Sequence, residues 1–383
     1  MSQTAVRFAI APVTTPEQME QFLDVPARVY ANDPNWVPPL RSSVAKKFAP
    51  DNPFFQYGRL QAFVALDSDS QPAGRIVAAV NDRLVEAEGK PVGLFGFFEC
   101  IDDFEIANSL LEAACDWLRD RGTIEVRGPI DLSTHNDCLF LVEGFDSPPM
   151  VMMPYNPPYY PQFMERAGWE KAKDAYAYDF PLDKPLPPEF EKAHRIACKS
   201  GVTFRPIRTK GEGFEQDARS LYRLFTTAFS NNWSSTPRSE AEFLEEAREM
   251  QDLVDPDVFP IAEYDGEMVG FFMGFPDYNI PMKHVNGKLN WWGIIKFLWY
   301  RRKINRGRVM VICSLPEYRR KMVPLALIYL GIRGSQIKGK PYKRAELSWV
   351  WEDNQASRRL IEASGGELFK TYRIYQKSLS RSP

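Results

Sequence analysis

A basic turn contains the residues best suited to binding an anion. The segment RVMVIC, residues 308–313, predicts a strand, and PLALIYL, residues 324–330, predicts the first turns of an apolar helix. Arg319, Arg320 and Lys321 lie between them, where cations can contact a phosphate near the positive end of a helix. The turn itself contains no glycine, the residue that lets backbone N–H groups approach phosphate most closely. The chemistry indicated is phosphate binding through side-chain charge, with a solvated basic turn as the alternative.

The polar segment DLSTHND, residues 131–137, offers acid–base chemistry. His135 lies there in a loop after a predicted strand, close in sequence to Asp131 and Asp137. Imidazole titrates near neutral pH and can accept a proton from a nucleophile. We take His135 as a candidate general base; a histidine on a solvent-facing loop is an equal alternative.

Internal repeats indicate how these residues are positioned. The segments 63–80 and 260–275 both predict strand, polar turn, glycine and strand, with Gly74 and Gly270 196 positions apart. A chain of 383 residues also exceeds the size at which one hydrophobic core stops growing. A duplicated domain is therefore predicted. Five further residue pairs match at an offset of 197: Glu165/Glu362, Gly168/Gly365, Glu170/Glu367, Lys173/Lys370 and Tyr178/Tyr375.

Each half is predicted to be an α/β (α+β) domain, with a mixed, mostly antiparallel sheet flanked by helices. The proline-rich segment 181–190 is the predicted linker, so the domains are 1–182 and 183–383. The main elements expected in the first half are strands near 60–66, 74–81 and 92–99 and a helix at 102–122. Those expected in the second half are strands at 258–264, 267–275, 308–313 and 344–351 and a helix at 324–337.

The turn of the first half that corresponds to the basic turn is acidic. Glu99, Asp102, Asp103 and Glu105 surround the start of its helix, where carboxylates repel a phosphate. This half is therefore not expected to bind an anionic ligand. Helix capping is one role for these acids, and attraction of an ammonium group is the other.

Composition limits the partners and the compartment. With 48 basic and 50 acidic side chains, the chain has no global charge bias toward nucleic acid. Its five cysteines lack metal-ligand spacing, and their odd number argues against a disulfide framework. No apolar run reaches the ~20 residues of a membrane-spanning helix. These features predict a cytoplasmic protein without a metal site.

The order of elements, with PEYRRK after one strand and EDNQASRRLIEASGG after the next, resembles the Gcn5-related N-acetyltransferase (GNAT) superfamily, present here as a tandem pair. RGPIDLS, VEGFDSPP, MMPYNPPYY and AELSWVWEDN resemble a bacterial tandem group that includes the bacterial ceramide synthases. The resemblance implies an enzyme of sphingolipid biosynthesis, an N-acyltransferase that moves a long-chain fatty acyl group from an acyl thioester to a sphingoid base. A GNAT acetyltransferase of a small amine and a non-catalytic, degenerate acyl-CoA-binding module are the alternatives.

The superfamily binds its thioester donor through Arg/Gln-x-x-Gly-x-Gly/Ala. Arg319 matches the first position, but Met322 and Pro324 replace both glycines. A helix end contributes only ~0.3–1 kcal/mol to binding an exposed anion, whereas a buried fatty chain contributes ~0.8 kcal/mol per CH2. We therefore expect a long-chain thioester of coenzyme A or of acyl carrier protein as co-substrate, with no tightly bound cofactor. The donor-binding residues expected are Leu315, Arg319, Arg320, Lys321 and Asn354.

The resemblance also assigns candidate roles at the reacting centre. Glu346 begins the strand whose counterpart borders the thioester cleft, and an ordinary edge carboxylate is its alternative. The tyrosine that acts as an acid in the superfamily falls at Ile361, so Tyr372 or Tyr375 would replace it. The candidate catalytic residues are thus His135, Glu346 and Tyr372. The candidate substrate-binding residues are Glu99, Asp102, Asp131, Trp291 and Trp292.

An apolar insertion is predicted at 277–307. Trp291 to Tyr300 is almost entirely apolar, and a run of arginine and lysine follows it. Aromatic rings followed by cations suit a membrane interface, with the basic groups on anionic lipid. We expect peripheral binding to the inner face of the cytoplasmic membrane; a buried core helix is the alternative.

Overall fold

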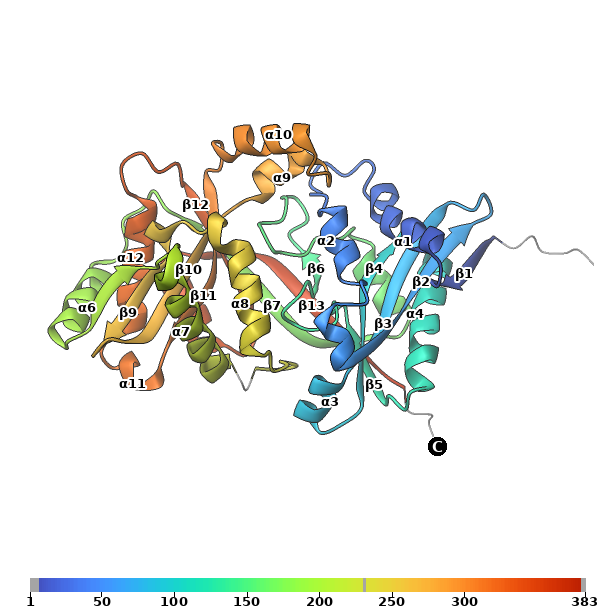
Figure 1. The fold of residues 1–383 in the computed structure, drawn as a ribbon, viewed down its shortest axis with the longest axis horizontal. Helices are drawn as coiled ribbons and strands as arrows, with labels where there is room; N and C mark the ends of the chain where they lie inside the picture. Colours follow the sequence, from blue (N-terminus) through green and yellow to red (C-terminus); the bar gives the residue numbers. More distant parts are fainter. Residues whose placement is uncertain (1–6, 230–231, 380–383) are drawn as a thin grey trace, which may run out of the picture.

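The computed structural model describes residues 7–229 and 232–379. Within these residues the strands form one 13-stranded sheet that runs through both halves of the molecule (Figure 1). The strands are β1 (Phe8–Pro12), β2 (Gly58–Asp67), β3 (Pro72–Asn81), β4 (Val92–Cys100), β5 (Glu125–Gly128), β6 (Phe140–Glu143), β7 (Glu170–Pro181), β8 (Thr203–Pro206), β9 (Pro260–Tyr264), β10 (Glu267–Pro276), β11 (Arg306–Ser314), β12 (Arg344–Trp351) and β13 (Glu367–Ser378).

Helices cover both faces of this sheet, so the predicted fold class is confirmed. The α-helices are α1 (Pro16–Val29), α2 (Arg41–Lys46), α3 (Asp82–Glu88), α4 (Phe104–Arg119), α5 (Tyr160–Arg166), α6 (Pro188–Lys199), α7 (Gly211–Phe229), α8 (Glu240–Met250), α9 (Asn279–Val285), α10 (Trp291–Arg301), α11 (Pro316–Arg319), α12 (Val323–Ser335) and α13 (Gln355–Ala363). Short 3-10 helices occupy Pro53–Gln56, Gln251–Leu253 and Pro256–Val258.

The structure shows the internal repeat at matching places in the two halves. Gly74 of β3 pairs with Cys100, and Gly270 of β10 pairs with Ser314, in each case at the last residue of the next strand. A Cβ on Gly74 would lie 2.7 Å from Leu110 of α4, and one on Gly270 would lie 3.1 Å from Leu327 of α12. Both glycines therefore let a helix pack closely on the sheet.

The last strand of each half lies in the sheet of the other half. β13 pairs with β5 and β6 of the first half, and β7 pairs with β12 of the second. β7 and β13 also pair with each other at the centre of the sheet. The strand order is β1-β2-β3-β4-β5-β13-β7-β12-β11-β10-β9-β8. The halves are thus joined by exchanged strands, and the domain boundary at 182/183 stays a prediction.

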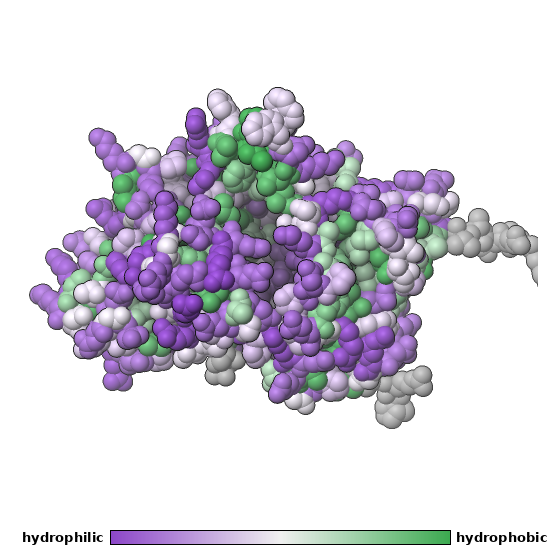
Figure 2. Space-filling view, in the orientation of Figure 1, coloured by the Kyte–Doolittle hydropathy of each residue, from purple (hydrophilic) through white to green (hydrophobic). Residues whose placement is uncertain are grey.

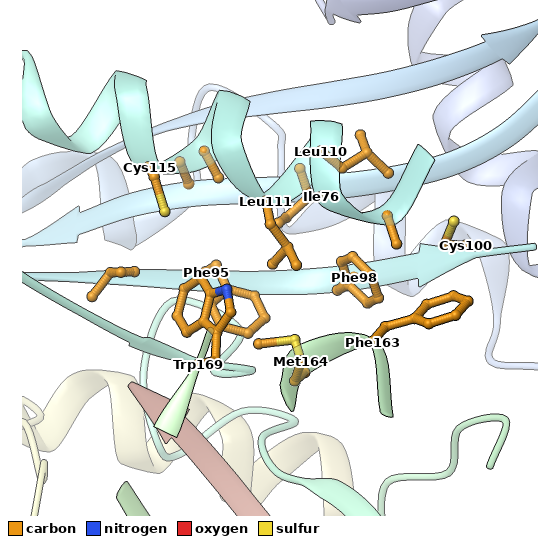
Figure 3. Packing of buried hydrophobic residues seen from close by; sticks show 14 of the residues in the cluster. Ile76, Phe95, Phe98, Cys100, Leu110, Leu111, Cys115, Phe163, Met164 and Trp169 are labelled. Carbon is orange, nitrogen blue, oxygen red and sulfur yellow. The ribbon is translucent and has the colours of Figure 1, made fainter. Parts of the chain in front are cut away.

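The core of the first half shows why its sheet carries helices on both faces. Strand residues alternate between the faces: Ile76 of β3 packs with Leu110 of α4, and the next residue, Val77, packs in the cluster that contains Phe22 of α1. In Figure 3, side chains of α4 point down toward β4, and Phe95, Phe98 and Trp169 lie with them in one cluster. Period-two burial of this kind fixes the strand register.

In the second half, the two faces of the sheet carry different helices. α6 and α12 pack on one face, where Phe272 of β10 lies among their side chains. α7 covers the other face, where Phe271 lies with Leu221 and Leu224. This arrangement places α12 and α7 on opposite sides of β11 and β12.

Candidate active site

The site lies where two parallel strands of the second half separate. β11 and β12 pair in register as far as Val309 and Leu347 and not beyond. β11 is also bulged against β10, because Met273 faces Val311 while the next residue, Gly274, faces Val309. A bulge bends a strand and re-aims its side chains. We call the space between the separated strands the open gap.

One cavity, the α12 cavity, lies on the side of the open gap that faces α12 and α13. Its volume is about 450 Å³, and its walls are mostly apolar, with Phe272, Ile328 and Leu360 among them. Arg319 and Asn354 contribute polar groups to its lining. Two of the five predicted donor-binding residues thus line one cavity.

A second cavity, the α7 cavity, lies on the opposite side of the sheet. It has a volume of about 580 Å³ and extends between α7, α8 and the strands, with Leu221 and Phe243 in its wall. His135 of the first half also lines it. Both volumes fall in the range of roughly 300–1,000 Å³ that small-molecule sites have. Residues shared by the two linings show that the cavities meet at the open gap: Phe229, Asn232, Arg308, Val309, Ile312, Leu347, Asn354, Ser357 and Ile361.

The basic turn, Arg319 to Lys321, lies just before α12 in the chain. Arg319 and Arg320 are exposed, and in the described part of the chain neither has a carboxylate within ion-pair distance. Lys321 lies 3.7 Å from the ring centre of Tyr264. Met322 precedes α12 in the left-handed conformation, with φ of 64°, a region that favours glycine. The backbone thus takes a glycine-like turn although the glycine is missing.

The other predicted donor-binding residues lie near this turn with different contacts. Leu315 precedes α11 and packs among the apolar residues on both faces of the sheet, so it lines neither cavity. Asn354 caps α13, and its Oδ1 accepts a hydrogen bond from the Ser357 backbone at 3.2 Å. The donor-binding role of the whole set stays a prediction.

His135 joins the two halves at the edge of the α7 cavity. Its Nε2 lies 2.8 Å from the carbonyl oxygen of Thr236, which makes Nε2 the hydrogen-bond donor. Burial, with a smaller effect of Arg238, lowers the pKa of His135 to about 4. The imidazole is therefore neutral at physiological pH and a weak base.

Glu346 lies in a buried polar cluster beside the open gap. Its side chain is 1% exposed and lines neither cavity. Oε1 accepts a hydrogen bond from Ser348 Oγ at 2.6 Å, whereas Oε2 is buried without a hydrogen-bond partner among the described residues. Burial raises the pKa of Glu346, and the charge of Arg308 opposes this rise.

Tyr372 is buried next to this cluster. Its hydroxyl has no hydrogen-bond partner in the described structure, and the residue lines neither cavity. Burial raises its pKa well above the ordinary value, with a further contribution from Glu346. The structure thus brings Tyr372 and Glu346 together but separates both from the cavity walls.

Two of the predicted acceptor-binding acids lie elsewhere. Glu99 accepts hydrogen bonds from Tyr30 and Tyr160, both at 2.8 Å, inside the first half. Burial raises its pKa to about 7. Asp102 is exposed, and neither acid lines the two cavities. Their role in acceptor binding stays a prediction.

Asp131 is bound to the strand next to it. Its Oδ1 accepts the backbone N–H of Phe97 at 2.7 Å, and its Oδ2 lies 3.9 Å from Lys47 Nζ. Lys47 also approaches Asp137 and lines the α7 cavity. Asp131 therefore does not line that cavity itself but contacts Lys47, which does.

Trp291 and Trp292 are exposed on α10. They are 71% and 70% exposed, and Trp299 of the same helix is 61% exposed. The opposite side of α10 packs on α9, and Phe297 stacks on Tyr278, the residue just before α9. Figure 2 shows hydrophobic side chains gathered over α10, above a hollow between the two halves. α10 is thus not the buried core helix of the alternative.

Sequence reasoning missed Arg308 and Ser348, which line the wall at the meeting point of the cavities. Arg308 Nε donates to Ser348 Oγ at 2.9 Å, and its Nη1 donates to the carbonyl oxygens of Val151 and Met152. An arginine inside the apolar strand RVMVIC was an available signal, because a buried charge needs partners. Among the described residues no group of acids, histidines and cysteines is suited to hold a metal.

Solved structures define the class of this fold. A tandem GNAT protein from the clavulanic acid biosynthesis pathway aligns with 98% of this chain and 100% of its own, with a TM-score of 0.57 and 13% identity. A Gcn5-related N-acetyltransferase from Sphaerobacter thermophilus aligns over 99% and 98%, with a TM-score of 0.54 and 16% identity. The chain has the tandem GNAT fold.

Proteins of similar sequence identify the family of this chain, whereas the solved structures identify only its fold. The bacterial ceramide synthase of Caulobacter vibrioides is 32% identical over 384 residues, which span 98% of this chain and 99% of that protein. Protein YghO of Escherichia coli K12 is 30% identical over 367 residues, 94% and 93% of the two chains. No protein-family model matches the chain. The chain belongs to the family of the Caulobacter bacterial ceramide synthase, and it is an acyltransferase.

Proposed function

We propose that the protein transfers a long-chain fatty acyl group from an acyl thioester to the amine of a sphingoid base. The observation that carries this proposal is the meeting of two largely apolar cavities at the open gap, with a basic turn beside only one of them. The relative named bacterial ceramide synthase supports the choice of acceptor.

The donor is assigned to the α12 cavity. Arg319 lines it beside the basic turn, where guanidinium groups can bind a phosphate of coenzyme A or the phosphodiester of acyl carrier protein. Asn354 at the open gap is placed to contact the donor arm. The thioester carbon then lies in the open gap between β11 and β12, in reach of the α7 cavity.

The acceptor is assigned to the α7 cavity. Its apolar wall between α7 and the sheet suits an aliphatic chain, whose burial contributes ~0.8 kcal/mol per CH2. The amine must lose a proton before it attacks. Glu346 suits this role better than His135, because the low pKa of His135 makes it a weak base.

α10 is assigned to the membrane surface from which a sphingoid base is taken. Its exposed side carries Trp291, Trp292 and Trp299. Arg301 ends the helix, and Arg302 and Lys303 follow it directly. Aromatic rings at headgroup level and cations on anionic lipid are typical of interfacial helices. None of the helices in the described ranges meets the length and apolarity needed to cross a bilayer.

An acylation assay tests the reaction. Purified protein is incubated with a sphingoid base and with acetyl, octanoyl and palmitoyl thioesters of coenzyme A and of acyl carrier protein, and the amide is measured by mass spectrometry. We expect amide formation with palmitoyl donors and little with acetyl donors. Transfer mainly of acetyl groups to short amines would favour the small-amine acetyltransferase, and donor binding without any transfer would favour the non-catalytic module.

Vesicle flotation tests the membrane contact. We expect wild type to co-float with vesicles that contain anionic lipid, and the variant Trp291→Ser/Trp292→Ser/Trp299→Ser to stay behind while it keeps its circular dichroism spectrum. The matched control is Ile124→Ser/Ile337→Ser/Leu368→Ser, which removes three exposed apolar side chains elsewhere and should still float. Equal flotation of both variants would contradict the assignment of α10.

A further inference from the structure

Ser348 lies between the buried carboxylate and the cavity. Ser348 Oγ donates to Glu346 Oε1 at 2.6 Å and accepts from Arg308 Nε at 2.9 Å. Ser348 lines the α7 cavity, whereas Glu346 lines neither cavity. A hydroxyl oxygen has two acceptor positions, and Arg308 uses one of them. The second acceptor position has no hydrogen-bond partner among the described residues.

This arrangement resolves a difficulty for Glu346 as the base. A general base must lie within hydrogen-bond reach of the proton that it removes, directly or through one intermediary. With a side chain 1% exposed, Glu346 has no direct route to an amine in the α7 cavity. Its carboxylate is nevertheless connected to the cavity through the single hydroxyl of Ser348.

We propose that Ser348 is a catalytic proton relay from the acceptor amine to Glu346. The inference rests on the proposed function. The ammonium group donates to Ser348 Oγ; its proton moves to Oγ as the Ser348 hydroxyl proton moves to Glu346 Oε1. The neutral nitrogen attacks the thioester carbon and a C–N bond forms. When the adduct collapses, the C–S bond breaks, and the second proton of the nitrogen passes to the leaving sulfur.

The surrounding charges suit this transfer. Burial raises the pKa of Glu346, and Asp277 at the end of β10 adds to this rise. The hydrogen bond from Ser348 and the charges of Arg308 of β11 and Lys370 of β13 act in the opposite direction and favour the ionised, proton-accepting form. Tyr372 of β13 adds an uncharged hydroxyl to the same cluster. Arg308 is fixed by carbonyl oxygens of the first half, so it holds Ser348 Oγ in place and also disfavours a second cation nearby. An ammonium at Ser348 is thereby made more acidic.

Kinetics at two pH values test the relay on the full-length protein with a sphingoid base and palmitoyl-CoA. We expect Ser348→Ala to lower kcat about 100-fold or more at pH 7. At pH 9.5 a larger fraction of the amine is already neutral, so the loss should shrink to less than about tenfold. Ser348→Thr, which keeps the hydroxyl, should retain most activity. Ser200→Ala, which removes a hydroxyl far from both cavities and bonded to Ile196, is the matched control.

A double-mutant cycle gives a second readout. Glu346→Gln should show the same pH-dependent loss, and Ser348→Ala/Glu346→Gln should be no slower than either single variant, because both break one relay. A loss in Ser348→Ala that is equal at both pH values, or additive losses in the double variant, would overturn the relay. If Ser348→Ala does not fold, Ser348→Thr serves instead. A folded Ser348→Thr that binds the donor normally but is inactive would likewise overturn the relay. If wild type acylates no long-chain amine, the proposed function itself fails.

Discussion

The gap between the parallel strands is closed in the first half and open in the second. The pairing of β4 with β5 ends at Leu94 and Arg127, just as the pairing of β11 with β12 ends at Val309 and Leu347. After β5, however, the chain returns to β4: Ile130 N–H donates to the Phe95 carbonyl at 2.7 Å. The carboxylate of Asp131 binds the next free N–H, that of Phe97, also at 2.7 Å.

The closed gap leaves no room for a ligand. A Cβ on Gly96 would lie 2.5 Å from the Ile130 carbonyl oxygen, and one on Gly128 would lie 2.4 Å from the Phe95 carbonyl oxygen. In the second half, both cavities reach the corresponding gap. Both halves thus share the scaffold, but among the described residues the two cavities reach the gap of the second half, where we propose that the acyl donor binds.

The N-termini of α4 and α12 also differ between the two halves, in their charge. Asp103 caps α4 and accepts the backbone N–H of Glu105, so carboxylates occupy the positive end of that helix. Arg319 and Arg320 stand before α12 without carboxylate partners in the described part of the molecule. Packing and electrostatics therefore both support the proposal that the anionic donor binds in the second half and not in the first.

Among the changes that compare the two halves, the largest expected effect comes from the basic turn. Arg319→Ala/Arg320→Ala should raise the donor KM about 10- to 100-fold, because the two exposed charges together are expected to contribute about 1.4–2.8 kcal/mol to phosphate binding. These charges bind phosphate in the ground and transition states alike, so kcat should change less. Glu105→Ala, at the corresponding helix start of the first half, is the control and should leave the donor KM unchanged. An unchanged KM in the arginine variant would move the donor site elsewhere.

The closed gap should depend on Asp131 for stability. Asp131→Ala leaves the buried Phe97 N–H without its acceptor, which should cost about 1–3 kcal/mol of unfolding free energy. Asp131→Asn keeps an acceptor oxygen and should lose less. Urea denaturation measures both, and calorimetry should show donor affinity unchanged. Equal stability of the two variants would mean that the N–H finds another partner and that Asp131 does not hold the gap closed.

The smallest effect is pH-dependent and concerns Glu99. Because burial raises its pKa from 4.5 to about 7, the folded state binds a proton that the unfolded state releases between these values. Its contribution to stability is present below pH 4.5 and is lost as the pH rises through 7. Glu99→Gln should therefore gain roughly 1 kcal/mol over wild type between pH 6 and pH 7, since its amide does not ionise. A pH-independent difference in urea denaturation would show that Glu99 ionises normally.

Sequence patterns predicted the strands, the helix after the basic turn and the duplication because these depend on local periodicity and on matching glycines. They could not predict the exchange of β7 and β13, because either strand fits either sheet by its own alternation of residues. The closed gap depends on a contact between Phe97 and Asp131, 34 positions apart, that no spacing rule indicates. Ser348 carried no signal, since a lone serine in an apolar strand is ordinary.

Counting the donor sites tests the central claim most directly. The full-length protein is titrated calorimetrically with a thioether analogue of palmitoyl-CoA, which binds but cannot transfer its chain. The open and closed gaps predict one bound analogue per chain, and a large loss of affinity in Arg319→Ala/Arg320→Ala. Two analogues per chain, or a single one whose Kd is the same in the arginine variant, would contradict the division of roles between the two halves.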